Sequence, residues 1–150
     1  MAKPEKTILV VEDSPAQALA LELLLREEGL QVLWASDGRN GVAMAQQHMP
    51  DVIVLDVEMP HMDGFEACKY LKEDPETADI PIVMLTVRDD VTTGKRGIDS
   101  GAIDFIPKDA FSGPVLLETL RQLHILPEPG NIAQSARDRG CQPEDDYGED

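Results

Sequence analysis

The sequence predicts an α/β fold built around a parallel β-sheet. Segments with strand and helix patterns alternate five times between Thr7 and His124, and this alternation is typical of strands joined by right-handed helical crossovers. The strand segments are short and apolar throughout, as Val52–Leu55 illustrates. Uniformly apolar, β-branched runs indicate parallel strands that are buried on both faces.

The first half of the chain contains three of the five predicted strands. They are Thr7–Val11, Val32–Ala35 and Val52–Leu55. A leucine-rich helix begins at Ser14 and Pro15, because Ser is a good N-cap and Pro is tolerated at the first helical position. It ends at Gly29, and its leucine density predicts packing against the sheet. A second helix, around Gly41–Ala45, follows a turn at Asp37–Gly38.

The second half contains two strands and three helices. The predicted segments are a helix at Phe65–Leu71, a strand at Ile80–Thr86, a helix at Asp90–Ser100, a strand at Ile103–Ile106 and a helix capped by Ser112. The Asp90–Ser100 helix is expected to be the least stable, because each Gly in a helix costs about 1 kcal/mol relative to Ala. An apolar stripe predicts a buried face on the last helix; it consists of Val115, Leu116, Leu117, Leu120 and Leu123.

The apolar pattern ends at Pro127. The end of this pattern divides the chain into a predicted domain, residues 1–126, and a tail, residues 127–150. The tail holds seven acidic and two basic residues and few apolar ones. Such a composition cannot bury enough apolar surface to fold, so we expect the tail to be disordered.

Charge and composition argue against several kinds of partner. The net charge of −16 argues against binding to nucleic acid, which needs a basic face, and against docking to anionic lipid. No apolar run approaches the roughly 20 residues of a membrane span, and no signal-peptide segment precedes the first strand. Cys68 and Cys141 have no metal-binding spacing, and Cys68 is expected to face the core from a helix. We therefore expect a cytoplasmic protein.

Chemically useful groups follow four of the predicted strands. They are Glu12 and Asp13, Asp56, Thr86, and Lys108. Because parallel strands point their carboxyl ends to one edge of a sheet, we expect these groups to converge there. A carboxylate cluster without His or Cys selects a hard cation such as Mg²⁺. A hydroxyl and an ammonium group beside it suit a phosphoryl group, with Asp56 as the nucleophile. Taken singly, each group has an ordinary alternative as a solvated or loop-capping side chain.

Four segments carry a resemblance to a known family. They are Val10-Val11-Glu12-Asp13-Ser14, the run from Asp56 to Gly64, Met84-Leu85-Thr86, and the run from Gly101 to Lys108. In the order and spacing of these four segments, the chain resembles the receiver domains of two-component response regulators. It is similar to the stand-alone chemotaxis regulator. The resemblance covers Thr7 to about His124. It implies a flavodoxin-like, doubly wound five-stranded sheet with strand order 2-1-3-4-5 and five helices.

The resemblance also implies a role for each acidic residue. Asp56 would accept a phosphoryl group from a histidine kinase or a histidine phosphotransfer protein. Asp13, Asp56 and the backbone carbonyl of Glu58 would bind Mg²⁺, and Glu12 would contribute through a water molecule. The protein would catalyse only its own phosphotransfer and dephosphorylation, and would not be an enzyme in any other sense.

The remaining implied roles concern signalling. Thr86 and Lys108 would bind the phosphoryl oxygens, and Phe105 would be the aromatic residue that moves inward with Thr86. The output would be contact with a downstream protein through the face of the fourth helix, the fifth strand and the fifth helix.

The chain departs from the family pattern in three places. Asp109 follows Lys108 where proline is usual after a cis peptide bond, and a cis bond before a non-proline residue costs about 2.5–4 kcal/mol. Bulky Val87 follows Thr86 where a small residue is usual. Phe105 stands where many members have Tyr.

Two alternative functions share part of this pattern, and one further contact is expected. A haloacid-dehalogenase-like phosphatase also uses an Asp nucleophile and Mg²⁺, but it requires a second Asp where this chain has Glu58. A pseudo-receiver would bind partners without ever taking phosphate, and the complete set of strand-end groups argues against it. Glu58 and Arg88 are expected to pair across the mouth of the phosphoryl site; the alternative is that both face solvent.

Overall fold

The structure is a computed structural model that describes residues 6–59, 61–87, 95, 99–108 and 112–127. Contacts divide the chain into two units, Met1–Leu116 and Leu117–Asp150. The elements are β1 (Thr7–Val11), α1 (Pro15–Glu27), β2 (Gln31–Ala35), α2 (Gly38–His48), β3 (Val52–Asp56), α3 (Gly64–Glu73), β4 (Ile82–Thr86), β5 (Asp104–Pro107) and α5 (Ser112–Gln122). The boundary between the units falls within α5, so each unit is described by itself.

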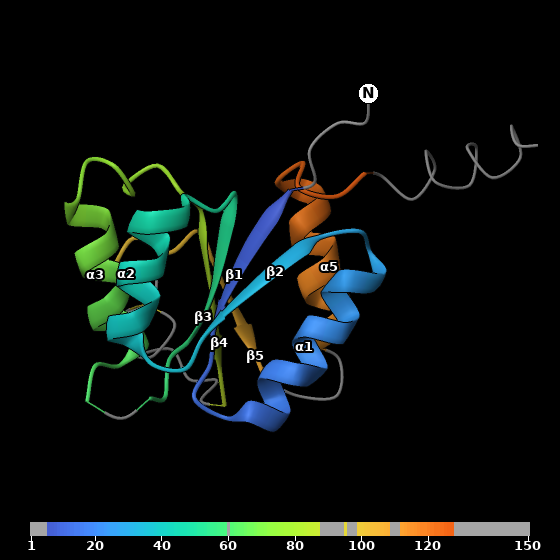
Figure 1. Ribbon diagram of the computed structural model, residues 1–150, viewed down its shortest axis with the longest axis horizontal. Coiled ribbons are helices and arrows are strands. Elements are labelled where there is room, and N and C mark those ends of the chain that lie inside the picture. Colours follow the sequence, from blue (N-terminus) through green and yellow to red (C-terminus); the bar gives the residue numbers. More distant parts are fainter. Residues whose placement is uncertain (1–5, 60, 88–94, 96–98, 109–111, 128–150) are drawn as a thin grey trace, which may run out of the picture. The chain divides into compact units, whose positions relative to one another are not determined.

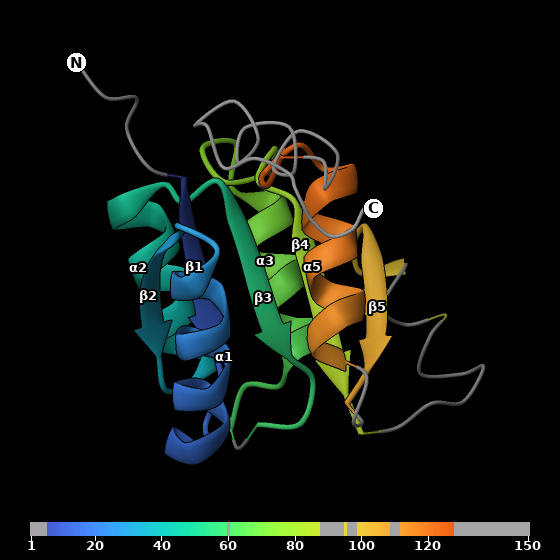
Figure 2. The same ribbon diagram turned by 90° about the vertical axis from the view of Figure 1, so that its right-hand side faces the viewer.

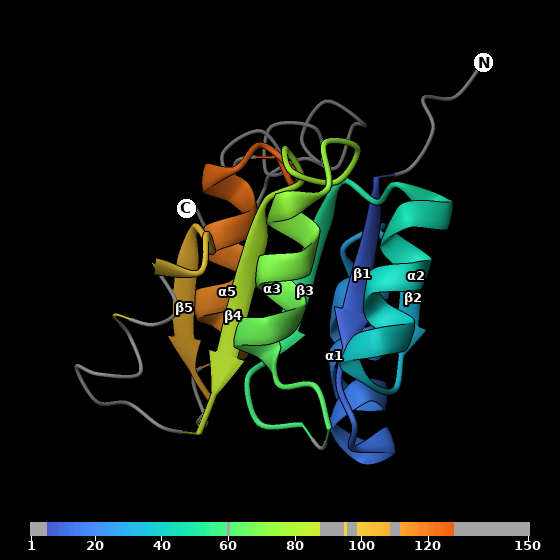
Figure 3. The ribbon, with the colours of Figure 1, turned by 90° about the vertical axis from the view of Figure 1, so that its left-hand side faces the viewer.

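The five strands form one parallel sheet with the order β2-β1-β3-β4-β5 (Figure 1). This is the flavodoxin-like order, which confirms the predicted fold class. In the first unit α1 covers one face of the sheet, whereas α2 and α3 cover the other (Figures 2 and 3). The central strands β3 and β4 are buried at every position, as the uniformly apolar sequence predicted.

The strand register brings the polar strand ends to one edge. Val11 pairs with Leu55 between β1 and β3, and Asp56 pairs with Leu85 between β3 and β4. Thr86 pairs with Pro107 between β4 and β5. Asp56 and Thr86 are therefore one position apart along neighbouring strands, at the edge where open α/β sheets bind ligands.

Local sequence signals account for the helix ends near this edge. The Ser14 side chain accepts a hydrogen bond from the Gln17 amide, with Pro15 in the first turn of α1, as predicted. Gly29 has φ of 88° just beyond the end of α1, a left-handed conformation that suits Gly. A capping box of Asp63 and Glu66 begins α3, so the loop after β3 is anchored where the helix starts.

The structure corrects the expected start of α2, and it confirms that α1 packs on the sheet (Figure 2) although some of its leucines are exposed. Asp37 is the N-cap of α2, accepting a hydrogen bond from the Asn40 amide at 2.7 Å, so Asp37–Gly38 begins the helix instead of forming a separate turn. On α1, Leu19 and Leu23 are 54% and 56% exposed, while Leu25 is fully buried. A helix presents only one face to a sheet, and a dense leucine run also places residues on the opposite face.

The last helix shows the same effect. Val115 is 45% exposed, although the neighbouring Leu116 is fully buried. Cys68 on α3 is fully buried, which confirms that it faces the core.

Some predicted segments lie outside the described residues. Within the fourth predicted helix, Asp90–Ser100, the structure describes only residues 95, 99 and 100, and Lys95 and Asp99 are helical. The described residues therefore contain four of the five predicted helices. Residues 128–150 are also outside them, and the boundary at Pro127 stays a prediction. None of the helices described is long and apolar enough to cross a membrane.

Candidate functional site

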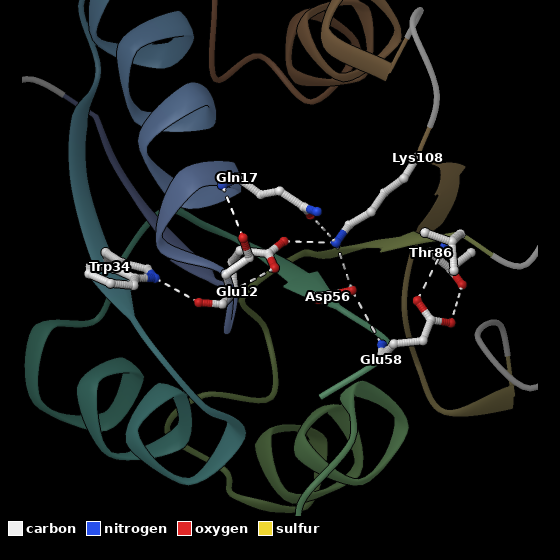
Figure 4. A network of polar contacts seen from close by, with 9 residues as sticks. Glu12, Gln17, Trp34, Asp56, Glu58, Thr86 and Lys108 are labelled. Carbon is white, nitrogen blue, oxygen red and sulfur yellow. Dashed lines mark hydrogen bonds and ion pairs between the residues drawn. The ribbon is translucent and has the colours of Figure 1, made fainter. Parts of the chain in front are cut away.

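The predicted strand-end residues meet at one edge of the sheet (Figure 4). Glu12 and Asp13 follow β1, Asp56 is the last residue of β3, and Thr86 is the last residue of β4. Lys108 directly follows β5 and reaches back toward β1 and β3. This convergence follows from the parallel sheet, whose strands all end at the same edge.

Three carboxylates form a tight acidic cluster. Glu12 and Asp56 are 1% and 2% exposed, whereas Asp13 is exposed. One carboxylate oxygen from each of the three lies within 4.8 Å of the others. Negative charges this close repel one another, and burial strengthens the repulsion. An all-oxygen donor set of this kind fits a hard divalent cation such as Mg²⁺.

Lys108 supplies positive charge to the cluster. Its Nζ lies 2.8 Å from a Glu12 carboxylate oxygen and 3.1 Å from Oδ1 of Asp56. Burial lowers the pKa of Lys108, but hydrogen bonds to Glu12 and Asp56 outweigh burial and leave this pKa above its usual value. Lys108 is therefore charged at neutral pH and aimed at the cluster, with its side chain 16% exposed.

Asp56 has an unusual titration. Burial, followed by the charge of Glu12, raises the pKa of Asp56 to about 7, although Lys108 opposes both effects. Without a cation, this carboxyl group holds a proton for part of the time at neutral pH. A divalent cation bound beside it favours the ionised form, because the ion's own charge dominates such a site.

Glu58 connects Asp56 to Thr86 (Figure 4). Its backbone amide donates to Oδ1 of Asp56 at 3.3 Å. Its carboxylate accepts two hydrogen bonds, from Oγ1 of Thr86 at 2.5 Å and from the Val87 amide at 3.2 Å. The sequence and the family resemblance predict only a backbone role for Glu58 and a side-chain partner in Arg88. Arg88 lies outside the described residues, so that pairing stays a prediction, and the contact with Thr86 was missed.

The two family departures within the described residues can be placed. Phe105 is half-buried, packs against the hydrophobic core and pairs with Met84 in the sheet. Val87 is 65% exposed. It lines a cavity of about 340 Å³ whose wall also includes Glu12 and Lys108, so its side chain stands at the approach to the cluster. Asp109 lies outside the described residues.

Comparison with known families decides what this site belongs to. Residues 8–122 match the response regulator receiver domain, a span that contains every residue of the cluster. The chain belongs to the response regulator receiver family. The match agrees with the strand order and with the acidic groups that follow β1 and β3.

Individual relatives support this assignment. The receiver is 42% identical over 113 residues to protein PilH of Pseudomonas aeruginosa. The aligned residues cover 75% of this chain and 89% of PilH. It spans only between 22% and 55% of the length of the other curated relatives compared, which are response and transcriptional regulators.

Two solved structures show the same fold. The chemotaxis protein CheY4 of Vibrio cholerae is 34% identical, with a TM-score of 0.74, over 79% of this chain and 98% of CheY4. The receiver domain of the sensor histidine kinase PA1611 of Pseudomonas aeruginosa PAO1 is 27% identical, with a TM-score of 0.73. The match covers 79% of this chain and 97% of the PA1611 receiver domain. That structure holds a magnesium ion in its active-site cleft.

Two further contacts of the receiver site were not predicted. Gln17, in the first turn of α1, accepts a hydrogen bond from Nζ of Lys108 at 2.8 Å. Trp34, on edge strand β2, donates from its indole Nε1 to the Glu12 backbone carbonyl at 2.8 Å. Neither residue belongs to a strand-end motif. The only available signal was that Gln17 lies in the first turn of the helix that follows the acidic pair.

Proposed function

We propose that this receiver accepts a phosphoryl group on Asp56 from a histidine kinase or a histidine phosphotransfer protein, and signals through phosphorylation-dependent contact with another protein. One observation carries the proposal: buried Asp56 lies 3.1 Å from Lys108 and within the acidic cluster of Glu12 and Asp13. A nucleophilic carboxylate, an adjacent fixed cation and a metal-binding donor set are the parts that phosphoryl transfer requires.

The transfer step uses residues at the carboxyl edge of the sheet. An Asp56 carboxylate oxygen attacks the phosphorus of a phosphohistidine, and the new O–P bond forms as the P–N bond breaks. The imidazole nitrogen keeps the electron pair and leaves with a proton from solvent. Lys108 neutralises charge on the transferred oxygens, because its ammonium group already lies beside Asp56. The Thr86 hydroxyl donates to a second phosphoryl oxygen.

The acidic cluster is proposed to bind Mg²⁺. Asp13, Asp56 and the backbone carbonyl of Glu58 would hold the ion directly, and Glu12 would hold it through a water molecule. The three carboxylates fit this role, because their oxygens lie within 4.8 Å of one another and offer only hard ligands. The bound ion supplies positive charge that offsets both the carboxylates and the incoming phosphoryl group.

The proposed output depends on Thr86 and Phe105. Phosphorylation draws Thr86 toward the phosphoryl group, and Phe105, which is half-buried beside the core, turns inward with it. The expected output face includes the fourth helix, most of which lies outside the described residues, so that face stays a prediction. Catalysis is proposed to extend no further than the protein's own phosphorylation and dephosphorylation.

Labelling with acetyl phosphate tests the proposal. In the presence of Mg²⁺, intact mass should show one added phosphoryl group, and Asp56→Asn should abolish it. Asp79→Asn, which changes an exposed Asp, is the matched control and should label normally. Labelling that survives in Asp56→Asn would reject Asp56 as the acceptor. Steady turnover of small phosphate esters would instead favour a phosphatase.

A further inference from the structure

Glu58 holds the donors at the end of β4 that a phosphoryl group would need. Its carboxylate accepts from the Thr86 hydroxyl at 2.5 Å and from the Val87 amide at 3.2 Å. Thr86 itself is fully buried. Two donors that converge on the two oxygens of one carboxylate form an anion-binding site, and here that site is filled by a side chain of the same protein.

The same residue also touches the acceptor. The Glu58 amide donates to Oδ1 of Asp56 at 3.3 Å, so the backbone of Glu58 lies against Asp56 while its side chain reaches Thr86. Asp56 and Thr86 end neighbouring strands that are paired in the sheet. A phosphoryl group on Asp56 and the carboxylate of Glu58 would therefore meet at the same donors.

The two anions cannot share those donors. A hydroxyl group has one proton to donate, and a backbone amide also has one. A carboxylate can only accept, so the Thr86 proton points to Glu58 while that hydrogen bond exists. Phosphorylation would also place new negative charge close to Glu58, and like charges at short range repel strongly in a partly buried site.

We propose that Glu58 is a latch on the phosphoryl site: its carboxylate occupies the Thr86 hydroxyl and the Val87 amide in the unphosphorylated receiver and must release both for the phosphoryl group to bind. The inference rests on the proposed function, because it requires a phosphoryl group on Asp56. Glu58 is a positioning residue, since it acts through Thr86 and Val87. The latch slows phosphoryl loading and links it to the movement of Thr86.

The rate of labelling by acetyl phosphate tests the latch. Hydrogen bonds to charged groups contribute enough that losing this competitor should raise the labelling rate of Glu58→Ala about tenfold. Glu58→Gln keeps the side-chain length and one acceptor oxygen, so its rate should lie between wild type and Glu58→Ala. The control is Glu27→Ala, which removes the same charge from an exposed position on α1 and should label at the wild-type rate.

A second background separates the latch from a general effect of charge. If Glu58 acts through Thr86, most of the gain from Glu58→Ala should disappear when Thr86 is also changed to Ala, a strongly non-additive result. Beryllofluoride is an unreactive phosphoryl mimic. In protein that keeps Thr86, Glu58→Ala should raise the affinity for beryllofluoride in parallel with the labelling rate, whereas in Thr86→Ala protein it should not.

Two results would overturn the latch: Glu58→Ala labelling no faster than Glu27→Ala, or a gain of the same size with and without the Thr86 hydroxyl. Failure of the proposed function looks different, because wild type itself would then take no phosphoryl group on Asp56.

Discussion

The indole of Trp34 donates a 2.8 Å hydrogen bond to the backbone carbonyl of Glu12, the residue whose carboxylate faces Asp56 and Lys108. Trp34 is the only tryptophan in the chain and is 40% exposed. One edge-strand side chain is therefore attached to the backbone of the acidic cluster. A rearrangement of the cluster that moves the Glu12 backbone would therefore change the surroundings of the indole.

Trp34 fluorescence should therefore report metal binding. Titration with Mg²⁺ should give a saturable change in emission. Asp13→Asn should raise the apparent Kd by about 10–100-fold or more, since losing even an outer-shell partner of a metal has that effect. Asp79→Asn should behave as wild type. If emission stays constant while calorimetry detects bound Mg²⁺ at the cluster, the link between Trp34 and the site is wrong.

Removing Lys108 should destabilise the metal-free protein. Lys108→Ala leaves the buried carboxylates of Glu12 and Asp56 without their cation, and breaking a buried ion pair costs about 3–5 kcal/mol. The loss should be smaller at pH 5, where protonation neutralises Asp56, and smaller with Mg²⁺. Urea unfolding measures the change. Lys69→Ala, at an exposed position on α3, is the control, and an equally small effect in both variants would contradict the ion-pair argument.

The contribution of Asp56 to metal-free stability should fall as pH rises toward neutrality. The pKa of Asp56 is about 7 in the folded protein and about 3.9 in an unfolded chain. Between these values the folded state holds a proton on Asp56 that the unfolded state has lost, so the contribution of Asp56 to the free energy of unfolding decreases with rising pH and levels off above about pH 7.

The variant Asp56→Asn isolates this contribution. In the presence of a chelator it should be more stable than wild type at pH 7.5. The difference should shrink as the pH falls toward about 3.9, the unfolded-state pKa, and vanish below it, where Asp56 is protonated in both states. Urea unfolding over this pH range provides the comparison. A stability difference that does not change with pH would show that the pKa of Asp56 is not raised.

Gly64 should tolerate no side chain. A Cβ atom added there would overlap the Asp56 carbonyl oxygen and lie 2.8 Å from the Cα of Val57. Both are backbone atoms, so Gly64→Ala must move the segment that carries Asp56. We expect a loss of about 1–3 kcal/mol in unfolding free energy, as in other overpacked sites, together with slower phosphoryl labelling.

Gly113→Ala is the matched control for this substitution. Its added methyl group would lie 3.3 Å from the flexible end of Leu24, which can move, and Ala is the better helix former by up to about 1 kcal/mol. Its unfolding free energy should stay within about 1 kcal/mol of wild type. A Gly64→Ala protein with wild-type stability would mean that the close approach to Asp56 relaxes at no cost.

Part of this receiver could be predicted from its sequence. Five apolar strand segments alternating with helices imply a parallel sheet, and a parallel sheet brings Asp56, Thr86 and Lys108 to one edge whatever the details of packing. Helix-capping residues such as Ser14 and Gly29 act within a few positions of themselves, so their roles were also predictable. These features depend on local conformation and on the common direction of the strands.

The partners of individual side chains depended on the tertiary structure. Distances between segments far apart in the chain decide which leucines of α1 are buried. They also set three contacts: Glu58 with Thr86, Gln17 with Lys108 and Trp34 with Glu12. The pKa of Asp56 has the same origin, since it reflects burial and the charge of a residue on another strand. Sequence by itself therefore determined which strand-end groups reach the site. Packing decided which side chains touch there, because hydrogen bonds and buried charges depend on separations of a few ångströms that no local pattern encodes.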